Sequence, residues 1–243
     1  GSVRQQQIPW ARIVAEGSVI VVSILLALGA DAAWEARKEL AQERNLLTGL
    51  LEEFRETRAI VADAADRHER VFRQTALQMA AYDERTSLDP TATWRTLRLV
   101  YFEYLTTHPK SGVLDGMLST GELDKLSDPA LRTALAGWPR RFREFREQEA
   151  VIERWVLVAG PELYRAAPFS RQALEYFDGD FQVTTPFAED LHLFLGTEDA
   201  KNLAAARALY EWHAVRDAGR LLDAVDGILE LLESELEAGG GPS

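Results

Sequence analysis

The sequence predicts an all-α protein in which one N-terminal transmembrane helix continues into a long helix that packs with a helical-bundle soluble domain. Three observations support this fold class. The stretch from Gly17 to Ala30 carries no charge, no proline occurs between Pro9 and Pro90, and the apolar residues downstream recur at helical spacing. With 243 residues, the chain is long enough for an anchor and one soluble domain.

The predicted transmembrane helix spans residues 13–34. Its uncharged core is shorter than the ~20 residues that a bilayer requires, but Trp10 and Trp34 lie on either side of it. Their separation corresponds to about 36 Å of helix, so both indoles can lie at headgroup level around a hydrocarbon layer of about 30 Å. A buried core helix of a soluble protein is the alternative. A cleaved signal peptide fits less well, because a charged helical sequence follows without a cleavage pattern.

Charges around the anchor predict its orientation. The leading segment, residues 1–12, carries Arg4 and Arg12 and no acid, so the positive-inside rule places it in the cytoplasm and residues 35–238 on the other side. Arginine far outnumbers lysine, a usage typical of GC-rich bacterial genomes, so we expect a bacterial inner membrane and a periplasmic domain. Residues 239–243 are expected to form a flexible tail. The residues expected at the membrane interfaces are Trp10, Arg12, Trp34, Arg37 and Lys38.

One helix is expected to run on from the anchor to about Tyr82. Its apolar residues recur every seven positions, at Leu40, Leu47, Phe54 and Val61. This stripe must be buried against later helices of the chain or against a second copy, so a homodimer through the long helix is one alternative. The helix contains three glycines at which it could bend, Gly17, Gly29 and Gly49.

The middle of the domain is expected to contain shorter helices. Residues 91–105 show helical apolar spacing, and a short amphipathic piece follows and ends at Gly121, a typical C-cap residue. The sequence Ser127-Asp128-Pro129 predicts the N-terminus of a further helix, because an N-cap side chain precedes a proline. Pro139 is expected to kink or end that helix.

The last third of the domain is less uniform. Residues 160–196 are the least regular part, and only there, as at residues 180–185, are strands credible. Thr197 predicts the N-cap of a final helix that runs to about Ala238, with a broad apolar stripe that includes Leu203, Leu209 and Trp212.

Composition and spacing argue against several kinds of chemistry. The net charge of −12 repels phosphate backbones, so no nucleic-acid partner is expected. The chain has no cysteine, which excludes disulfides, thiolate metal sites and thiol catalysis. The four histidines lack metal-ligand spacing, and no catalytic residue, metal or cofactor is predicted. The best functional candidates are the pairs His68–Glu69 and Trp212–His213 near Glu211, although a structural role is favoured for each.

Two groups of charged residues are candidates for docking a partner. Glu16 and Asp31 lie within the predicted span near its two ends, where a carboxylate can meet a polar group of a neighbouring subunit. The second group is a run of arginines that contrasts with the acidic whole: Arg140, Arg141, Arg143 and Arg146. This run could bind an acidic partner or lipid headgroups. Salt bridges to nearby glutamates, such as Glu144, Glu147 and Glu149, are a slightly favoured alternative.

Two stretches carry a resemblance to other proteins. In residues 15–54, AEGSVIVVSILLALGADAAWEARKELAQERNLLTGLLEEF, an apolar helix ends near an acid and a Trp and leads through a charged run into a long helix. In SGVLDGMLSTGELDKLSDPALRTAL, a turn is followed by Asp-Pro-x-Leu. Together these resemble a bacterial single-pass membrane-anchored family of uncharacterised function, although Asp31 stands where its members have Asn. The resemblance implies a transmembrane helix followed by a helical domain, and no established chemistry.

The features of the sequence concern attachment and packing more than catalysis. We therefore expect a non-enzymatic accessory or scaffolding subunit that contacts the lipid bilayer and stabilises a larger bacterial membrane protein complex, of a bioenergetic, photosynthetic, respiratory or other kind. A membrane-anchored sensor is the first alternative, with a pocket in residues 160–196 and a coiled-coil dimer through Leu40 to Val61. A membrane-tethered enzyme is the second, and it requires titratable residues that converge in a cleft.

Overall fold

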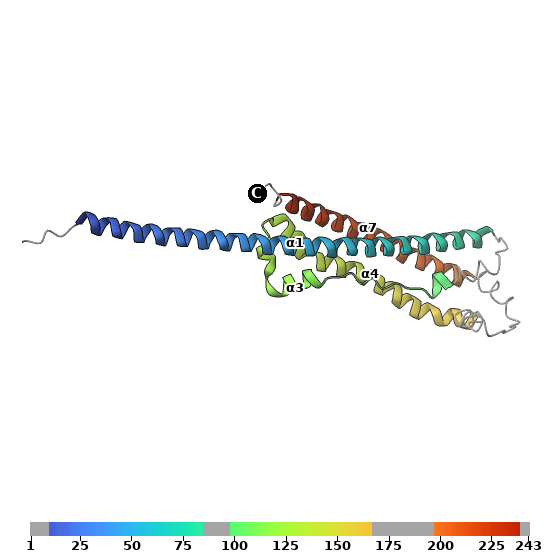
Figure 1. Ribbon diagram of the computed structural model, residues 1–243. Coiled ribbons are helices and arrows are strands. Elements are labelled where there is room, and N and C mark those ends of the chain that lie inside the picture. The colour runs from blue at the N-terminus through green and yellow to red at the C-terminus, as the bar shows by residue number, and fades with distance from the viewer. Residues whose placement is uncertain (1–9, 85–97, 167–196, 239–243) are drawn as a thin grey trace, which may run out of the picture.

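The computed structural model describes residues 10–84, 98–166 and 197–238, and among these the side chains of residues 22–80, 98–159 and 197–238. Over these ranges every regular element is a helix, which confirms the all-α prediction. The strand considered at residues 180–185 and the predicted tail at 239–243 lie outside the described residues. The elements in chain order are α1 (Trp10–Glu84), α3 (Gly112–Thr120), the 3₁₀ helix η1 (Glu122–Lys125), α4 (Pro129–Ala166) and α7 (Glu198–Ala238) (Figure 1).

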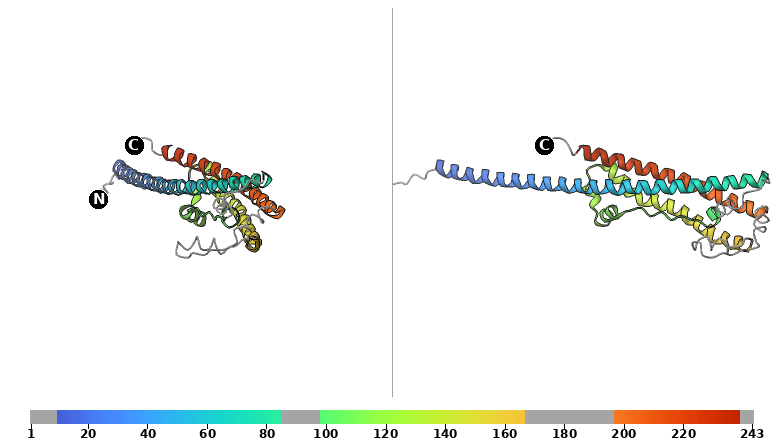
Figure 2. Two further views of the ribbon diagram at one scale, coloured as in Figure 1. Left: turned by 90° about the vertical axis from the view of Figure 1, so that its right-hand side faces the viewer. Right: turned by 45° about the vertical axis from the view of Figure 1, so that its right-hand side comes forward.

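Helix α1 is one uninterrupted helix of 75 residues, about 110 Å long at 1.5 Å per residue. This confirms the long helix predicted to end near Tyr82, and the glycines considered as bends do not interrupt it. Its N-terminal part projects alone from the molecule, whereas its second half lies along α4 and α7 (Figures 1 and 2). Since isolated helices gain most of their stability from packing, the second half is the part stabilised by the other helices.

The bundle is held together by buried lines of residues spaced alternately three and four apart. Helices α1 and α4 run in the same direction and α7 runs in the opposite one (Figure 1). This spacing is that of coiled coils, in which one seam of each helix faces its partners. The lines are Leu47, Leu50, Phe54, Thr57, Val61 and Ala64 on α1; Leu131, Leu135, Trp138 and Phe145 on α4; and Ala214, Ala218, Leu221, Val225, Ile228 and Leu232 on α7.

The heptad stripe predicted on the long helix is therefore buried within the chain. Leu47, Phe54 and Val61 are at most 4% exposed, and the edge of the Phe54 ring contacts Trp138 of α4 with centroids 5.4 Å apart. Leu40 differs, because it lies before the bundle begins and is 65% exposed. The homodimer stays a prediction, but its interface cannot use the stripe from Leu47 to Val61 in this fold.

The seam between α1 and α4 is covered by residues 103–111, the connection that precedes α3. The helix predicted over 91–105 ends at Tyr101 among its described residues, and residues 103–111 form no regular element, which corrects its predicted end at Leu105. These residues are fixed by side chains instead. Thr57 of α1 donates a hydrogen bond to the Lys110 carbonyl (3.2 Å), and Lys110 pairs with Glu56 (2.6 Å).

Helix α3 is anchored to α1 at its N-terminus and capped as predicted at its C-terminus. The Glu53 carboxylate of α1 accepts hydrogen bonds from the amides of Val113 (2.6 Å) and Leu114 (3.1 Å), two donors that a helix start leaves unpaired. Gly121 ends the helix in the left-handed conformation with φ of 75°, which glycine adopts without strain.

Helix α4 begins as predicted but does not end at its first internal proline. Asp128 accepts hydrogen bonds from the amides of Ala130 (2.8 Å) and Leu131 (3.3 Å), which confirms the N-cap. The helix then continues through Pro139, so of the two predicted outcomes, a kink or an end, the end is wrong. An internal proline costs roughly 3 kcal/mol, and the burial of Leu135, Trp138 and Phe145 around it offsets that cost.

Helix α7 begins and ends where the sequence predicts. The Thr197 hydroxyl accepts a hydrogen bond from the Ala200 amide (3.2 Å), and the helix ends at Ala238. Ion pairs close its seam with α1, between Arg55 and Glu233 (2.8 Å) and between Arg58 and Asp226 (2.5 Å).

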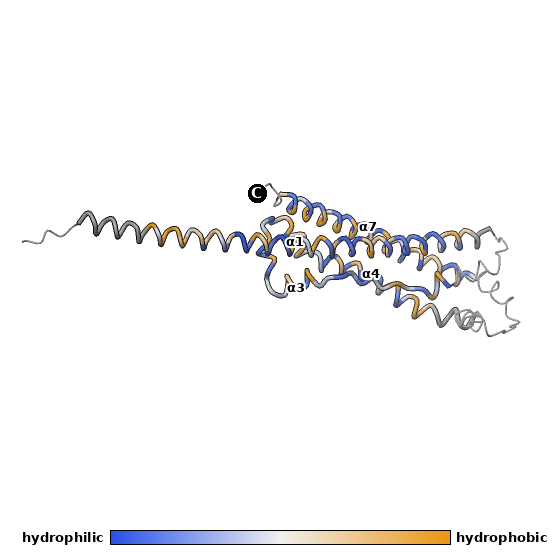
Figure 3. The backbone as a smooth tube through the Cα atoms, viewed as in Figure 1, coloured by the Kyte–Doolittle hydropathy of each residue, from blue (hydrophilic) through white to orange (hydrophobic). Residues whose placement is uncertain are grey.

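The projecting part of α1 makes no contribution to the core. Every side chain from Val22 to Gln42 is exposed, and this part changes from orange to blue before it reaches the bundle in Figure 3. Along the helices whose side chains are described, no stretch is both long and apolar enough to cross a membrane.

Candidate functional site: a buried layer of charged residues

The distal half of the bundle contains four buried charged side chains where the packing lines would otherwise continue with apolar residues. His68 follows Val61 by seven positions on α1, Glu149 lies on α4, and Arg207 and Glu211 lie on α7. Each is at most 1% exposed. We call His68, Glu149, Arg207 and Glu211 the buried charged layer. Because a buried charge is costly unless it is paired, the contacts of each member decide whether the bundle is stable here.

His68 links the three long helices. Its Nδ1 lies 2.6 Å from Glu211 Oε2, a hydrogen-bonding distance, and its Nε2 lies 3.5 Å from Glu149 Oε1. The second distance is too long for a well-formed hydrogen bond, so Nε2 interacts with Glu149 mainly through charge. The ring also contacts the Phe145 ring edge-on, with centroids 6.1 Å apart. One imidazole of α1 is thus held between carboxylates of α4 and α7.

Glu149 is the most completely hydrogen-bonded member of the layer. Its carboxylate accepts hydrogen bonds from the Thr107 amide (3.0 Å) and the Thr107 hydroxyl (2.5 Å), which attach the connection before α3 to α4. Arg146, one turn earlier on α4, donates a further hydrogen bond to Glu149. Its partners therefore come from α1, from α4 itself and from the connection.

Arg207 is enclosed between Glu211 and an aromatic pair. Its Nη2 lies 2.7 Å from Glu211 Oε1 and donates a hydrogen bond to the Glu103 carbonyl (2.7 Å). The guanidinium carbon lies 5.4 Å from the centre of the Trp155 ring, which stacks on Tyr101 at 5.8 Å. Its Nε and Nη1 make no hydrogen bond to the described residues. Arg207 thus remains charged, and among the described residues its ion-pair partner is Glu211.

The layer shifts the pKa values of His68 and Glu149 in opposite directions, and burial lowers the pKa of the third shifted member, Arg207. Burial opposes the charged imidazolium of His68, but the carboxylates of Glu149 and Glu211 outweigh it, so the pKa of His68 is raised above its ordinary value. Burial likewise opposes ionisation of Glu149, but His68, Thr107 and Arg146 outweigh it, so the pKa of Glu149 is lowered. The shifts of His68 and Glu149 both favour the state in which the histidine is protonated and the carboxylate is ionised.

We expect the free energy of unfolding to fall as the pH rises above about 6.5, because the pKa of His68 is raised by folding. A group whose pKa is raised by folding contributes its stability below the unfolded pKa, about 6.5 for histidine, and loses it as the pH rises through the folded pKa. Glu149 acts at the other end, because its contribution is present above about pH 4.3 and is lost on acidification through its lowered pKa. Urea unfolding across this range measures the slope.

The matched variants for that experiment are His68→Gln and His213→Gln. The first removes the titrating ring of the layer and should flatten the decline above about pH 6.5, whatever its effect on absolute stability. The second removes a half-buried histidine that lies outside the layer, against Trp212 of its own helix, and it is the control for loss of an imidazole elsewhere in the bundle. An equal slope in wild type and His68→Gln would contradict the assignment.

The layer contains residue types that are common in active sites, but its side chains are not open to a substrate in solution. Its side chains are almost fully buried and line neither of the two grooves that we describe on the bundle. Within the three described ranges, no cluster of three or more His, Asp or Glu is arranged to hold a metal ion. The contacts instead join the helices, which is the role expected of polar residues at coiled-coil core positions.

One groove lies between α4 and α7 and has a volume of about 510 Å³. Phe145 and Leu221, both buried, form its floor. We call it the α4/α7 groove, and its rims carry Arg140, Arg141 and Glu144 of α4 and Arg216, Asp217, Arg220 and Asp223 of α7. A smaller groove of about 290 Å³ lies where α1 enters the bundle, between Leu40 and Leu47 of α1 and Leu236 of α7.

The predicted docking arginines separate into two groups. Arg140, Arg141 and Arg143 are exposed on α4, and the first two line the α4/α7 groove. Arg140 pairs with Glu144 of the next turn at 3.2 Å. Arg146 pairs with Glu149, which is the salt bridge considered as the alternative for this run, and its docking role stays a prediction.

The membrane-interface candidates all lie on the projecting part of α1. Trp34, Arg37, Lys38 and the docking candidate Asp31 are exposed there. The side chains of Trp10, Arg12 and Glu16 lie outside the described residues. Of the candidates whose side chains are described, Asp31, Trp34, Arg37 and Lys38, none lies against the bundle.

No protein-family model matches the chain, and comparisons with curated proteins and with solved structures found no similar protein. The function must therefore be argued from the residues and their arrangement.

Proposed function

We propose that the chain is a non-enzymatic, single-span membrane-anchored accessory subunit whose bundle supports a larger bacterial membrane complex. Residues 13–34 act as the anchor, residues 1–12 lie in the cytoplasm, and the bundle lies in the periplasm. The likeness to the membrane-anchored family of uncharacterised function is part of the same proposal. The features that support it are the length of α1, the character of its free end and the closed interior of the bundle.

The observation that carries the proposal is the exposed aliphatic surface at the free end of α1. Val22, Ile24, Leu25, Leu26 and Leu28 are between 53% and 69% exposed, although they lie within seven consecutive positions. A helix that is apolar all round is typical of a membrane span or a buried core, and no other described element covers this one. Lipid tails would remove this surface from water at about 25 cal/mol per Å².

The segment between the apolar end and the bundle fits a short stalk. Trp34, 69% exposed, lies at the position expected for a membrane interface, and Leu47 is the first fully buried residue of the α1 line. The thirteen positions between them correspond to about 20 Å of helix. The stalk would hold the bundle just clear of the headgroups, in reach of other subunits.

The proposal is tested by purifying the tagged full-length chain from bacterial membranes in mild detergent and identifying co-purifying chains by mass spectrometry. We expect one or a few different membrane proteins in fixed stoichiometry. A preparation from residues 35–243, which lack the predicted anchor, is the control and should retain none of them. Absence of any heterologous chain would contradict the subunit proposal. A lone homodimer would favour a sensor, and turnover that is lost on substituting Glu149 or Glu211 would favour an enzyme.

A further inference from the structure

The three helix seams of the bundle are closed to different degrees. The α1/α7 seam is joined by the ion pairs of Arg55 and Arg58 with acids of α7. The α1/α4 seam is covered by α3 and by the connection, through Glu53, Thr57 and Thr107. The α4/α7 seam contains the 510 Å³ groove instead, and no ion pair joins its two rims along that groove in the described residues. Helices α4 and α7 do pack together, and Gln148 of α4 donates a hydrogen bond to the Tyr210 carbonyl of α7 (3.1 Å), but the groove leaves a hollow along this seam.

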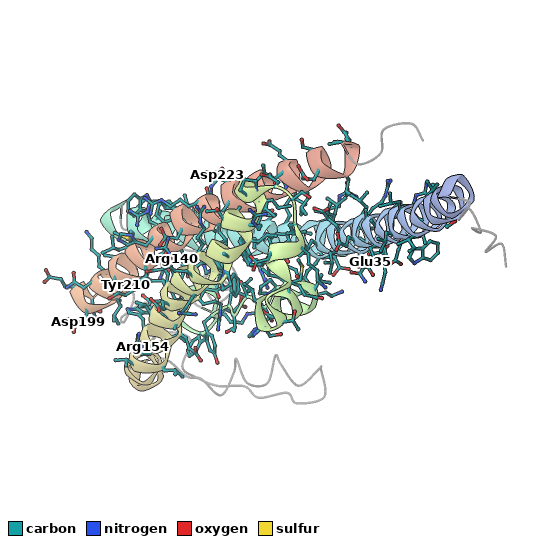
Figure 4. The ribbon with its side chains drawn as sticks, turned by 90° about the vertical axis from the view of Figure 1, so that its left-hand side faces the viewer. Glu35, Arg140, Arg154, Asp199, Tyr210 and Asp223 are labelled. Atoms are coloured by element: carbon teal, nitrogen blue, oxygen red, sulfur yellow. The ribbon has the colours of Figure 1, made fainter. Side chains whose placement is uncertain are left out.

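The charges on the rims of the α4/α7 groove are only partly satisfied. The ion pairs of the described rim residues stay within one helix: Arg140 with Glu144 (3.2 Å) on α4, and Asp217 with Arg216 (3.3 Å) and Arg220 (3.2 Å) on α7. Arg141 of α4 and Asp223 of α7 make no ion pair or hydrogen bond with the described residues, although both line the groove. One rim therefore presents an unpaired cation and the other an unpaired anion. Figure 4 looks onto these two helices and labels Arg140 and Asp223.

We propose that the α4/α7 groove is a homodimer interface, in which Arg141 of each copy pairs with Asp223 of the other. A two-fold axis parallel to the bundle turns the groove of one copy towards that of its partner, so that the α4 rim of one faces the α7 rim of the other. Residues keep their height along this axis, and Arg141 and Asp223 line the same short groove. The two unpaired charges thus become two reciprocal ion pairs in one symmetric contact.

This arrangement suits two chains anchored in one membrane, and in that respect it rests on the proposed function. The axis keeps both bundles the same way up, with both N-terminal ends of α1 pointing to the same side. A small, polar-rimmed contact is weak between free molecules, whereas tethering raises the effective concentration of the second copy. The floor residues Phe145 and Leu221 are already buried, so specificity comes from the rims and is expected to depend on salt.

The absence of cysteine from the chain allows a direct test in native membranes. Two full-length chains with different tags, R140C and R220C, are co-expressed and treated with a flexible bis-maleimide. Because each chain carries one thiol, any R140C–R220C adduct joins two copies. We expect this mixed adduct in clear excess over adducts of R73C, whose site is 71% exposed on α1 away from the groove. No excess over R73C would overturn the interface.

Charge exchange tests the reciprocal pair itself. R141D alone and D223R alone should each lower the mixed adduct several-fold, because like charges then meet across the interface, and R141D with D223R on the same chain should restore it. Failure of the double substitution to restore the adduct would overturn the Arg141–Asp223 contact. Both sites are on the surface, and circular dichroism confirms that each variant is folded.

The same samples separate this inference from the proposed function. Sedimentation with membranes reports anchoring independently of cross-linking. A mixed adduct from a chain that does not sediment would support the interface and contradict the anchor. A chain that sediments with membranes but gives no mixed adduct would support the anchor and contradict the interface.

Discussion

We expect Glu211→Ala to lower the free energy of unfolding by about 3–5 kcal/mol, the cost of removing one partner from a buried ion pair. Glu211 is the hydrogen-bonding partner of His68 at 2.6 Å and the ion-pair partner of Arg207 at 2.7 Å. Without it, a guanidinium that is 1% exposed keeps its charge but loses its counter-ion. Arg207 cannot neutralise itself by losing a proton, so the bundle must open locally or admit water. Urea unfolding at pH 6 measures the loss.

The matched control is Glu69→Ala, which removes an ion-paired glutamate from the surface of α1. Glu69 pairs with Arg73 four residues later, at 2.6 Å, and such exposed pairs contribute about 0.3–0.5 kcal/mol. The two substitutions delete the same side chain and differ in burial and partners. A loss below about 1 kcal/mol for Glu211→Ala would contradict the charged state of the layer, because an unpaired buried charge costs more than that.

The sequence contains part of the signal for this layer. The seven-residue period through Leu47, Phe54 and Val61 arrives at His68 when it is extended by one step, so burial of that histidine was predictable from the pattern. The identity of its partners was not, because Glu149 and Glu211 are 81 and 143 positions away in the chain. A period along one helix predicts which residues face inwards, and only the packing of three helices determines which of them meet.

The line on α7 was harder to predict because it is built from small and charged residues. The apolar stripe expected there included Leu209 and Trp212, which are 54% and 45% exposed. The buried line passes instead through Ala204, Arg207 and Glu211. Alanines allow the helices to approach closely, and the charged pair is acceptable only because His68 and Trp155 lie opposite. Hydrophobicity of the single helix therefore indicates the wrong face at this end.

Capping residues in the sequence predicted three helix ends correctly. The helix ends that were predicted wrongly depend on contacts with other helices. The caps at Asp128, Thr197 and Gly121 depend on side chains or backbone within a few residues, and all three are present. The continuation of α4 through Pro139 depends on core residues from other helices. The loss of helix after Tyr101 likewise depends on Thr107, which binds Glu149 of α4 rather than its own chain neighbours.

The second large effect concerns the free end of α1, where we expect Leu25→Arg to move the chain out of the membrane. Leu25 is near the middle of the predicted span 13–34 and is 62% exposed. An arginine at the centre of a transmembrane helix costs about 2.5–3.5 kcal/mol, which corresponds to roughly a hundredfold change in partitioning. The bundle should be unaffected, because its core begins more than twenty residues later, at Leu47.

Leu77→Arg provides the matched control, since Leu77 is 63% exposed on the same helix but lies beside the bundle. Membranes from cells that express each full-length chain are washed at alkaline pH, and the fraction that stays in the pellet is measured. If residues 13–34 are the anchor, wild type and Leu77→Arg stay in the pellet and Leu25→Arg is released as a folded protein. Release of all three chains alike into the detergent-free wash would contradict the anchor.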